Sequence, residues 1–266
     1  MIYMYKLINF LKKFLIKDTL YCINYLFFIG QKNYKEKITF LTDDAFLRQS
    51  DTKSTIRFGD GEIGIIHYSK VHYQDFDEKL REKMIEMIQN YTKDSSYILG
   101  VPLHATLENK LAPTFGENKI FLWMPTKITF RLLFNKNLPY FDAHFFYRDG
   151  KARSFFLEKI KNKKVIIVTK KDTVNKMQES FLVSNSLQAT YIISPSENTF
   201  SVYENICNQI KSIIKEDYGA FVTFLACGPA SKVIAYELAK DHIICHDIGF
   251  GIEIMLTNES YEHRIN

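Results

Sequence analysis

The chain has 266 residues, and its 35 Lys and Arg against 30 Asp and Glu give a net charge of +5. Hydrophobic residues make up 46% and charged residues 24% of the sequence, values that exclude a disordered, collagen-like or coiled-coil chain. The mild positive charge also argues against nucleic acid as a partner, because a nucleic-acid-binding domain concentrates basic residues on one face.

Residues 1–30 are basic and apolar. On a helix, Leu7, Leu11 and Phe14 share one side and the lysines fall elsewhere. This pattern is typical of a helix lying peripherally on the inner face of the cytoplasmic membrane. It is equally typical of an amphipathic helix packed on the domain or on a second copy in a homo-oligomer. The longest uncharged run is shorter than the roughly 20 residues of a membrane-spanning helix, and no signal-peptide cleavage site follows it.

The four cysteines lie far apart and form no CxxC pair, which argues against a zinc or thioredoxin-type site. We expect reduced structural thiols in a cytoplasmic protein, at Cys22, Cys207, Cys227 and Cys245.

In the first half of the chain, apolar residues at helical spacing alternate with short apolar runs. Helices are expected at residues 34–49, after an N-terminal cap at Asp77, and at 117–134. Strands are expected at residues 54–58, 97–101 and 143–147.

The second half has clearer signals. Continuous apolar runs predict strands buried on both faces, with helices between them, at residues 165–168, 191–193, 221–225 and 243–245. This alternation predicts an α/β fold whose sheet is mainly parallel and covered by helices on both faces. We divide the chain into an N-terminal helical extension, residues 1–50, and one α/β domain, residues 51–266.

Ligands of such sheets bind at the carboxyl ends of the strands, and the first candidate segment there is Arg57-Phe58-Gly59-Asp60-Gly61-Glu62. Two carboxylates one residue apart point the same way on an extended backbone. They suit Mg²⁺ or Mn²⁺ bridged to substrate phosphates, and Arg57 adds a fixed positive charge. Taken alone, Gly-Asp-Gly is equally typical of a solvated turn.

The second segment, Ala226-Cys227-Gly228-Pro229-Ala230-Ser231-Lys232, follows a buried strand and opens a helix. The free N–H groups of such a helix start attract an anion, and Ser231 and Lys232 add a hydroxyl and a charge. Neither the GxxxxGK[ST] nor the GxGxxG spacing is present. The alternative is an ordinary helix start with Pro in its first turn.

The third segment is His246-Asp247-Ile248-Gly249, after the last predicted strand. Asp247 there is able to bind a ribose hydroxyl, a metal or an acceptor, or to act as a base; the alternative is a turn cap. Among the scattered histidines, His104 and His246 also lie at predicted strand ends.

These segments, with a Pro-x-x-Asn element at Pro195 and Asn198, resemble in their order the glycosyltransferases of GT-D type over residues 56–253. The resemblance implies a Rossmann-like fold that binds a nucleotide sugar and a divalent metal through an Asp-x-Glu motif. Phe250 stands where the family often has His after Asp-Ile-Gly.

The resemblance assigns roles to individual residues. Asp60 and Glu62 match the Asp-x-Glu metal motif and, with Asp247, are the expected catalytic residues. The expected donor-binding residues are Arg57, Gly59, Gly228, Pro229, Ser231, Lys232 and Gly249.

The resemblance therefore implies an Mn²⁺- or Mg²⁺-dependent transfer of a hexose from a UDP-sugar to a surface glycan, a lipid-linked sugar or a glycoprotein in a bacterium. The metal and Lys232 would stabilise the departing diphosphate, with Asp247 or His104 as the acceptor's base. Two alternatives stay open: a non-catalytic nucleotide-binding or assembly protein of the same fold, and a Rossmann-like methyltransferase.

Overall fold

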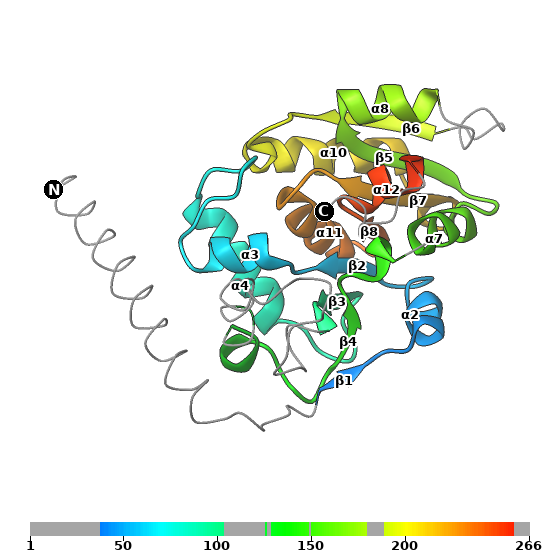
Figure 1. The fold of residues 1–266 in the computed structure, drawn as a ribbon. Helices are drawn as coiled ribbons and strands as arrows, with labels where there is room; N and C mark the ends of the chain where they lie inside the picture. The colour runs from blue at the N-terminus through cyan, green and yellow to red at the C-terminus, as the bar shows by residue number, and fades with distance from the viewer. Residues whose placement is uncertain (1–37, 104–125, 127–128, 149, 180–188, 258–266) are drawn as a thin grey trace, which may run out of the picture.

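Parallel strands form a single sheet across the part of the chain that the computed structural model describes, residues 38–103, 126, 129–148, 150–179 and 189–257 (Figure 1). Their spatial order is β1-β4-β3-β2-β8-β7-β5-β6, and every neighbouring pair is parallel. The strands are β1 (Thr39–Phe40), β2 (Ser54–Arg57), β3 (Tyr97–Val101), β4 (Pro139–Asp142), β5 (Lys164–Lys170), β6 (Ala189–Ser194), β7 (Phe221–Ala226) and β8 (Cys245–Asp247).

Both faces of this sheet are buried, as its continuous apolar runs predict. In β5, Ile166 and Val168 belong to one hydrophobic cluster, and Val165 and Ile167 belong to another. Because successive side chains of a strand point to opposite faces, the two clusters are the two sides of the sheet.

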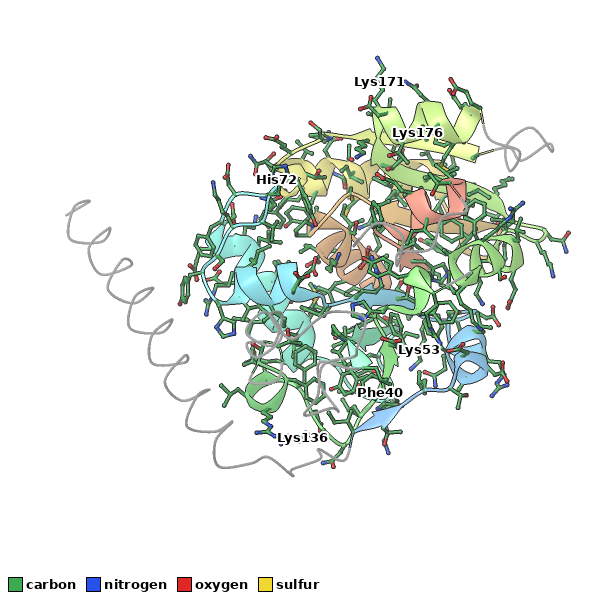
Figure 2. All side chains as sticks on the ribbon, in the orientation of Figure 1. Phe40, Lys53, His72, Lys136, Lys171 and Lys176 are labelled. Carbon is green, nitrogen blue, oxygen red and sulfur yellow. The ribbon has the colours of Figure 1, made fainter. Side chains whose placement is uncertain are left out.

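Helices cover each side. The side with Ile166 carries α3 (Asp60–Ile66), α4 (Glu78–Gln89), α10 (Tyr203–Ile214) and α11 (Ala230–Lys240). The opposite side carries α2 (Asp43–Gln49), α7 (Lys151–Lys159), α8 (Lys171–Gln178) and α12 (Gly251–Thr257). Helix α8 shows the division clearly, since Met177 is buried while Lys171 and Lys176 project from the outer edge (Figure 2). The predicted α/β fold with helices on both faces is confirmed.

The strand order explains where a ligand site forms. After β2 the chain adds β3 and then β4 on one side of β2. It then crosses to the other half of the sheet, where it forms β5 and the edge strand β6, and it finally places β7 and β8 between β5 and β2. Strand β8 is thereby placed beside β2, with Thr55 paired to His246. A crevice at the carboxyl ends of strands is the usual ligand site where the direction of building reverses.

The predicted helix at residues 34–49 is too long at its start. Residues 39–40 form β1, which pairs with Pro139 and Tyr140 of β4. Helix α2 begins only at Asp43, because the Thr42 hydroxyl accepts a hydrogen bond from the Ala45 N–H and caps it. Phe46 of α2 then enters the core.

The predicted strand at residues 143–147 is wrong. The strand is β4, and residues 145–147 form the short 3₁₀ helix η3 (Phe145–Tyr147). The Asp142 carboxylate accepts a hydrogen bond from the His144 N–H at 3.1 Å, a local turn that ends the strand.

The last strand begins two residues later than predicted. Ile243 N–H still bonds to the Leu238 carbonyl of helix α11, so β8 starts at Cys245 and includes Asp247. The described residues also include the short 3₁₀ helices η4 (Thr199–Val202) and η5 (Tyr218–Ala220).

Some expectations fall outside the described residues: the amphipathic helix within residues 1–30, His104, and most of the helix expected at 117–134. Among the residues that are described, no helix is long and apolar enough to cross a membrane.

His246 is a titratable group enclosed in the core. It is 1% exposed, its ring packs edge-on against Phe155 at 5.0 Å, and its Nδ1 lies 3.4 Å from the Thr55 hydroxyl. Burial, with a smaller contribution from the charge of Lys159, lowers the pKa of His246 to about 3. The folded protein therefore holds this ring neutral, while the unfolded chain protonates it near its ordinary pKa.

We predict that this ring makes the fold acid-sensitive. The unfolded state binds the proton first as the pH falls below about 6.5, so the free energy of unfolding should drop by about 1 kcal/mol between pH 7 and pH 5.5 because of this residue. Denaturant titrations at both pH values should show a smaller drop in His246→Leu than in the wild type. Equal drops in the two proteins would contradict the assignment.

Candidate active site

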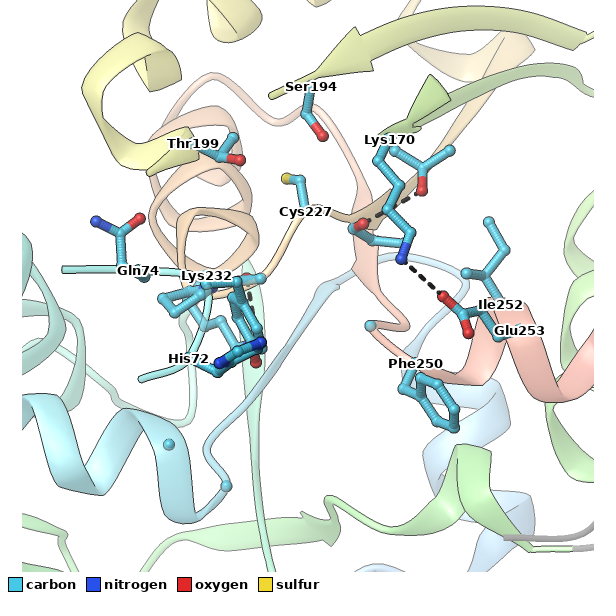
Figure 3. Close-up of a pocket in the computed structure, with 18 of the residues that line it drawn as sticks. His72, Gln74, Lys170, Ser194, Thr199, Cys227, Lys232, Phe250, Ile252 and Glu253 are labelled. Carbon is cyan, nitrogen blue, oxygen red and sulfur yellow. Dashed lines mark hydrogen bonds and ion pairs between the residues drawn. The ribbon is translucent and has the colours of Figure 1, made fainter. Parts of the chain in front are cut away.

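A cavity of about 560 Å³ opens at the carboxyl ends of β2, β5, β6, β7 and β8 (Figure 3). All of the site residues expected from the sequence line it except Asp247 and Ser231. Residues at separate strand ends meet because parallel strands finish at the same edge of the sheet.

Arg57, the last residue of β2, lines this cavity and is joined to Asp247, the last residue of β8, which lies behind it. The Arg57 backbone N–H donates to Asp247 Oδ2 at 3.1 Å, and its Nε donates to the Asp247 carbonyl at 2.9 Å. Arg57 Nη2 also lies 3.5 Å from Asp247 Oδ1. The Asp247 side chain has no exposed surface, so its role is to hold Arg57 rather than to face a ligand directly.

Lys232 joins this pair from the first turn of α11. Its Nζ lies 3.0 Å from Glu62 Oε1 and 3.2 Å from Asp247 Oδ2. The second Glu62 oxygen accepts the Gly59 N–H at 2.8 Å. We call Arg57, Glu62, Lys232 and Asp247 the ion cluster; it connects β2, α3, β8 and α11.

The ion cluster keeps its cations charged. Burial opposes the charge of Lys232, but the carboxylates of Asp247 and Glu62 raise its pKa above the usual value. Burial likewise opposes the charge of Arg57, and Tyr147 and Asp247 raise its pKa. Two buried positive charges therefore persist beside the cavity at any physiological pH.

Asp60 is different, because its side chain is exposed at the first position of α3. In the described part of the chain, no hydrogen bond or ion pair joins its carboxylate to another side chain. Desolvation at the cavity wall, and then the nearby charge of Glu62, raise the pKa of Asp60 above its ordinary value. Among the described residues, therefore, no cation neutralises the carboxylate that Asp60 offers the cavity.

The helix start at residues 228–232 is only partly as expected. Gly228 and Pro229 line the cavity, and Gly228 has a φ of +68°. Ser231 does not reach the cavity: it is fully buried and its Oγ accepts the Cys227 N–H at 3.0 Å. Its hydroxyl therefore stabilises the turn before α11.

Tyr73, which no sequence motif marks, lies in the loop between α3 and α4 and lines the cavity. A Cβ on Gly228 would lie 2.8 Å from the Tyr73 ring, so the ring covers this glycine. Burial, and then the charge of Glu62, raise the pKa of Tyr73 to about 12, which keeps its hydroxyl protonated.

Asn198 holds this loop in place. Its Oδ1 accepts the Asp75 N–H at 2.7 Å, its Nδ2 donates to Asp75 Oδ2 at 3.1 Å, and its N–H donates to the Tyr73 carbonyl at 3.0 Å. Asn198 does not line the cavity. Asn198 of the Pro-x-x-Asn element therefore fixes the loop that carries Tyr73, and Pro195 of the same element lines the cavity.

Acidic side chains outnumber basic ones around the cavity. Within the described part of the chain, the charged lining residues are Asp60, Glu62, Asp172, Glu197 and Glu253 against Arg57, Lys170 and Lys232. No group of three or more His, Cys, Asp or Glu suited to a metal occurs among the residues that the structure describes. A phosphate group entering this cavity meets more negative than positive charge.

The comparisons with known proteins identify the family. A family model for the glycosyltransferase GT-D fold matches residues 55–265. The chain belongs to the GT-D glycosyltransferases. A relative, the "Probable glycosyl transferase Gly" of Streptococcus gordonii, is 23% identical in an alignment of 222 residues that covers 74% of this chain but only 29% of that protein.

Solved structures agree with this membership at the level of the fold. A selenomethionine-substituted structure of domain of unknown function 1792 has a TM-score of 0.68 at 19% identity and covers 85% of this chain and 84% of its own. A new glycosyltransferase (DUF1792) from Streptococcus sanguinis has a TM-score of 0.64 at 20% identity and covers 84% of this chain and 87% of its own.

Gly249 of this GT-D glycosyltransferase lies directly against the ion cluster. Its φ is +47°, and a Cβ there would lie 2.0 Å from Arg57 Nη2. Gly150 also has a positive φ, +67°, but a Cβ there would meet nothing within 4 Å. Comparing the same substitution at Gly249 and Gly150 therefore separates the cost of backbone strain from the cost of displacing Arg57.

We predict that Gly249→Ala destabilises the protein more than Gly150→Ala. Both variants carry the strain of a left-handed backbone, about 1–3 kcal/mol, but only Gly249→Ala also pushes Arg57 away from Asp247. Urea unfolding measures the difference. Equal losses of unfolding free energy would show that Arg57 tolerates the displacement.

Proposed function

We propose that this glycosyltransferase transfers a hexose from a nucleotide sugar, with UDP as the expected nucleotide, in a reaction that needs Mn²⁺ or Mg²⁺. The proposed acceptor is a surface glycan, a lipid-linked sugar or a glycoprotein. The observation that carries the donor assignment is the Asp60 carboxylate, which no side chain of the described residues pairs with, at a cavity that also contains the buried cations Arg57 and Lys232.

The charge balance supports a metal requirement. Lys232 is already compensated by Glu62 and Asp247, and Arg57 by Asp247. Because acidic residues outnumber basic ones in the cavity lining, a diphosphate that entered without a metal would be repelled. A divalent cation that enters with the diphosphate removes this repulsion.

The donor set fits such a cation. Mg²⁺ and Mn²⁺ are commonly held by one or two carboxylates, with phosphate oxygens and water completing the shell. Asp60 offers both its oxygens, and Glu62 keeps a second lone pair on each oxygen beside the bonds to Lys232 and Gly59. Asp60 and Glu62 are therefore the residues that would hold the metal.

Charge developing on the leaving diphosphate is the main barrier that the site addresses. When bound, the metal would act as a Lewis acid on the phosphate oxygens. Lys232 and Arg57 contribute fixed positive charges that need no reorganisation, because Asp247 and Glu62 hold them in place. Gly228 and Pro229 bring the start of α11, with its positive dipole end, to the same wall.

We assign Asp247 a positioning role. Of the two residues considered for the acceptor's base, His104 lies outside the described residues. Asp247 has no exposed surface and is engaged by Arg57 and Lys232. That geometry favours a carboxylate that orients two cations over one that takes a proton from an acceptor.

The proposal extends to location and assembly. We propose a cytoplasmic enzyme whose residues 1–30 contact the inner face of the membrane, where lipid-linked acceptors occur, or a second copy of the chain. The catalytic unit in this proposal is residues 51–266, although β1 and α2 from residues 39–49 also pack on the sheet.

We predict that UDP and UDP-sugars bind more tightly with Mn²⁺ than without it, and that Asp60→Asn removes most of this difference. Loss of the free carboxylate should weaken the metal-dependent affinity by at least about tenfold. Isothermal titration calorimetry of UDP, with and without Mn²⁺, measures it, and release of sugar from the UDP-sugar that binds best reports turnover.

Asp44→Asn is the matched control. Asp44 is also an exposed acid in the first turn of a seven-residue helix, α2, but it lies outside the cavity. It should bind UDP and Mn²⁺ as the wild type does. Equal binding of UDP with and without metal, together with no effect of Asp60→Asn, would refute the metal assignment.

A further inference from the structure

Ser194 ends β6 and lines the cavity at the edge farthest from Asp60. Its side chain points into the pocket (Figure 3), yet the residue is only 3% exposed. Its Oγ has no hydrogen-bond partner. A buried hydroxyl without a partner costs free energy, so this one calls for a physical explanation.

The position of Ser194 separates it from other such atoms. Within the described part of the chain, buried side-chain oxygens without a hydrogen-bond partner occur on Thr126, Tyr191, Ser194, Thr223 and Asp247. Of these residues, Ser194 is the one that lines the cavity. A ligand in the cavity can therefore complete the hydrogen bonding of Ser194.

Neighbouring hydroxyls at this end of the cavity already have partners. Thr169 Oγ1 donates to the Ala226 carbonyl at 3.3 Å, and Thr199 Oγ1 donates to the Pro195 carbonyl at 3.0 Å. Ser194 is thus left to meet a ligand group, with which it can act as donor or acceptor.

The rest of this end suits a flat, partly polar group. Ile252 of the lining offers apolar surface, and Lys170 Nζ lies 3.2 Å from Glu253 Oε1 beside it (Figure 3). A nucleoside combines a ring that packs on apolar side chains with hydroxyl, carbonyl and N–H groups that bond to a serine.

The sheet sets the distances between the parts of the site. Adjacent strands lie about 4.8 Å apart. Strand β7, which leads into Gly228 and α11, is therefore about 10 Å from β6 on one side and about 10 Å from β2 on the other. A diphosphate beside Gly228 would extend its nucleoside toward Ser194 while its metal rests on Asp60.

We propose that Ser194 binds the nucleoside of the donor, which occupies the β5–β6 end of the cavity. This inference rests on the proposed nucleotide-sugar function and adds a specificity residue to it. Diphosphate and metal are held at the β2–β7 end, and Ser194 contacts neither.

Calorimetry on the full chain tests the assignment with three probes: UDP with Mn²⁺, uridine alone, and inorganic pyrophosphate with Mn²⁺. Ser194→Ala should weaken UDP and uridine binding by about five- to tenfold and leave pyrophosphate binding unchanged. Ser194→Thr, which keeps the hydroxyl, should retain most of the affinity. Asp60→Asn should show the reverse pattern, with pyrophosphate weakened and uridine unaffected.

Two controls make the result specific to the hydroxyl. Ser196→Ala removes an exposed serine of the same lining and should bind all three probes as the wild type does. Urea unfolding of ligand-free Ser194→Ala should show no loss of stability, because its hydroxyl makes no hydrogen bond in the fold.

The outcomes separate the two proposals. If the wild type binds UDP with Mn²⁺ and Ser194→Ala binds it equally well, the role of Ser194 is overturned while the proposed function stands. If Ser194→Ala weakens pyrophosphate as much as UDP, the nucleoside is not at this end. If the wild type binds neither UDP nor uridine, both proposals fail.

Discussion

A buried set of four charges organises this protein. Arg57, Glu62, Lys232 and Asp247 come from β2, α3, α11 and β8, and each cation is within ion-pair distance of at least one carboxylate. Removing one partner from such a set leaves a buried charge uncompensated, at a typical cost of about 3–5 kcal/mol. These ion pairs therefore tie the four elements together at the cavity wall.

The meeting of these four charges follows from the order of the strands. Arg57 and Asp247 are 190 residues apart in the chain, and they meet because β8 inserts beside β2. Gly249 leaves room for Arg57 after β8, since a Cβ there would lie 2.0 Å from Nη2. Gly249 and Arg57 therefore depend on each other in the fold, although they lie far apart in the sequence.

Much of the fold and part of the site could be predicted from sequence for a physical reason. Strands buried on both faces read as unbroken apolar runs, so the cores of β3, β5 and β7 were located closely. Residues that follow such runs converge at one edge, which brought Asp60, Lys232 and Gly228 to one cavity. The neighbours of each strand, in contrast, depend on long-range packing that no local pattern records.

The sequence motifs also do not show in which direction a side chain points in the fold. Ser231 sits in a motif with Lys232, but one residue of helix rotates it into the core, where it bonds to the Cys227 N–H. Tyr73 faces the cavity without any motif to mark it, whereas Ser194 lies at the end of a predicted strand, where ligand-binding residues are expected. Tyr73 gets there through a loop that Asn198 clamps from a segment 125 residues later in the chain, and such a contact exists only in the folded state.

The charged residues of the site differ in exposure: the ion cluster is buried, and Asp60 is exposed. The carboxylates of the ion cluster are engaged by Arg57 and Lys232, so Glu62 has only its remaining lone pairs to offer a metal. Asp60, outside the cluster, has a carboxylate with no cationic partner in the described part of the chain. Desolvation raises the pKa of Asp60, which means that its charge is costly until a cation shares it. In the reaction that we propose, a metal that arrives with a diphosphate would relieve this cost and the repulsion between the phosphate and the acidic lining at the same time. Affinity for the metal and for the nucleotide should therefore be coupled through Asp60, so that neither binds strongly without the other.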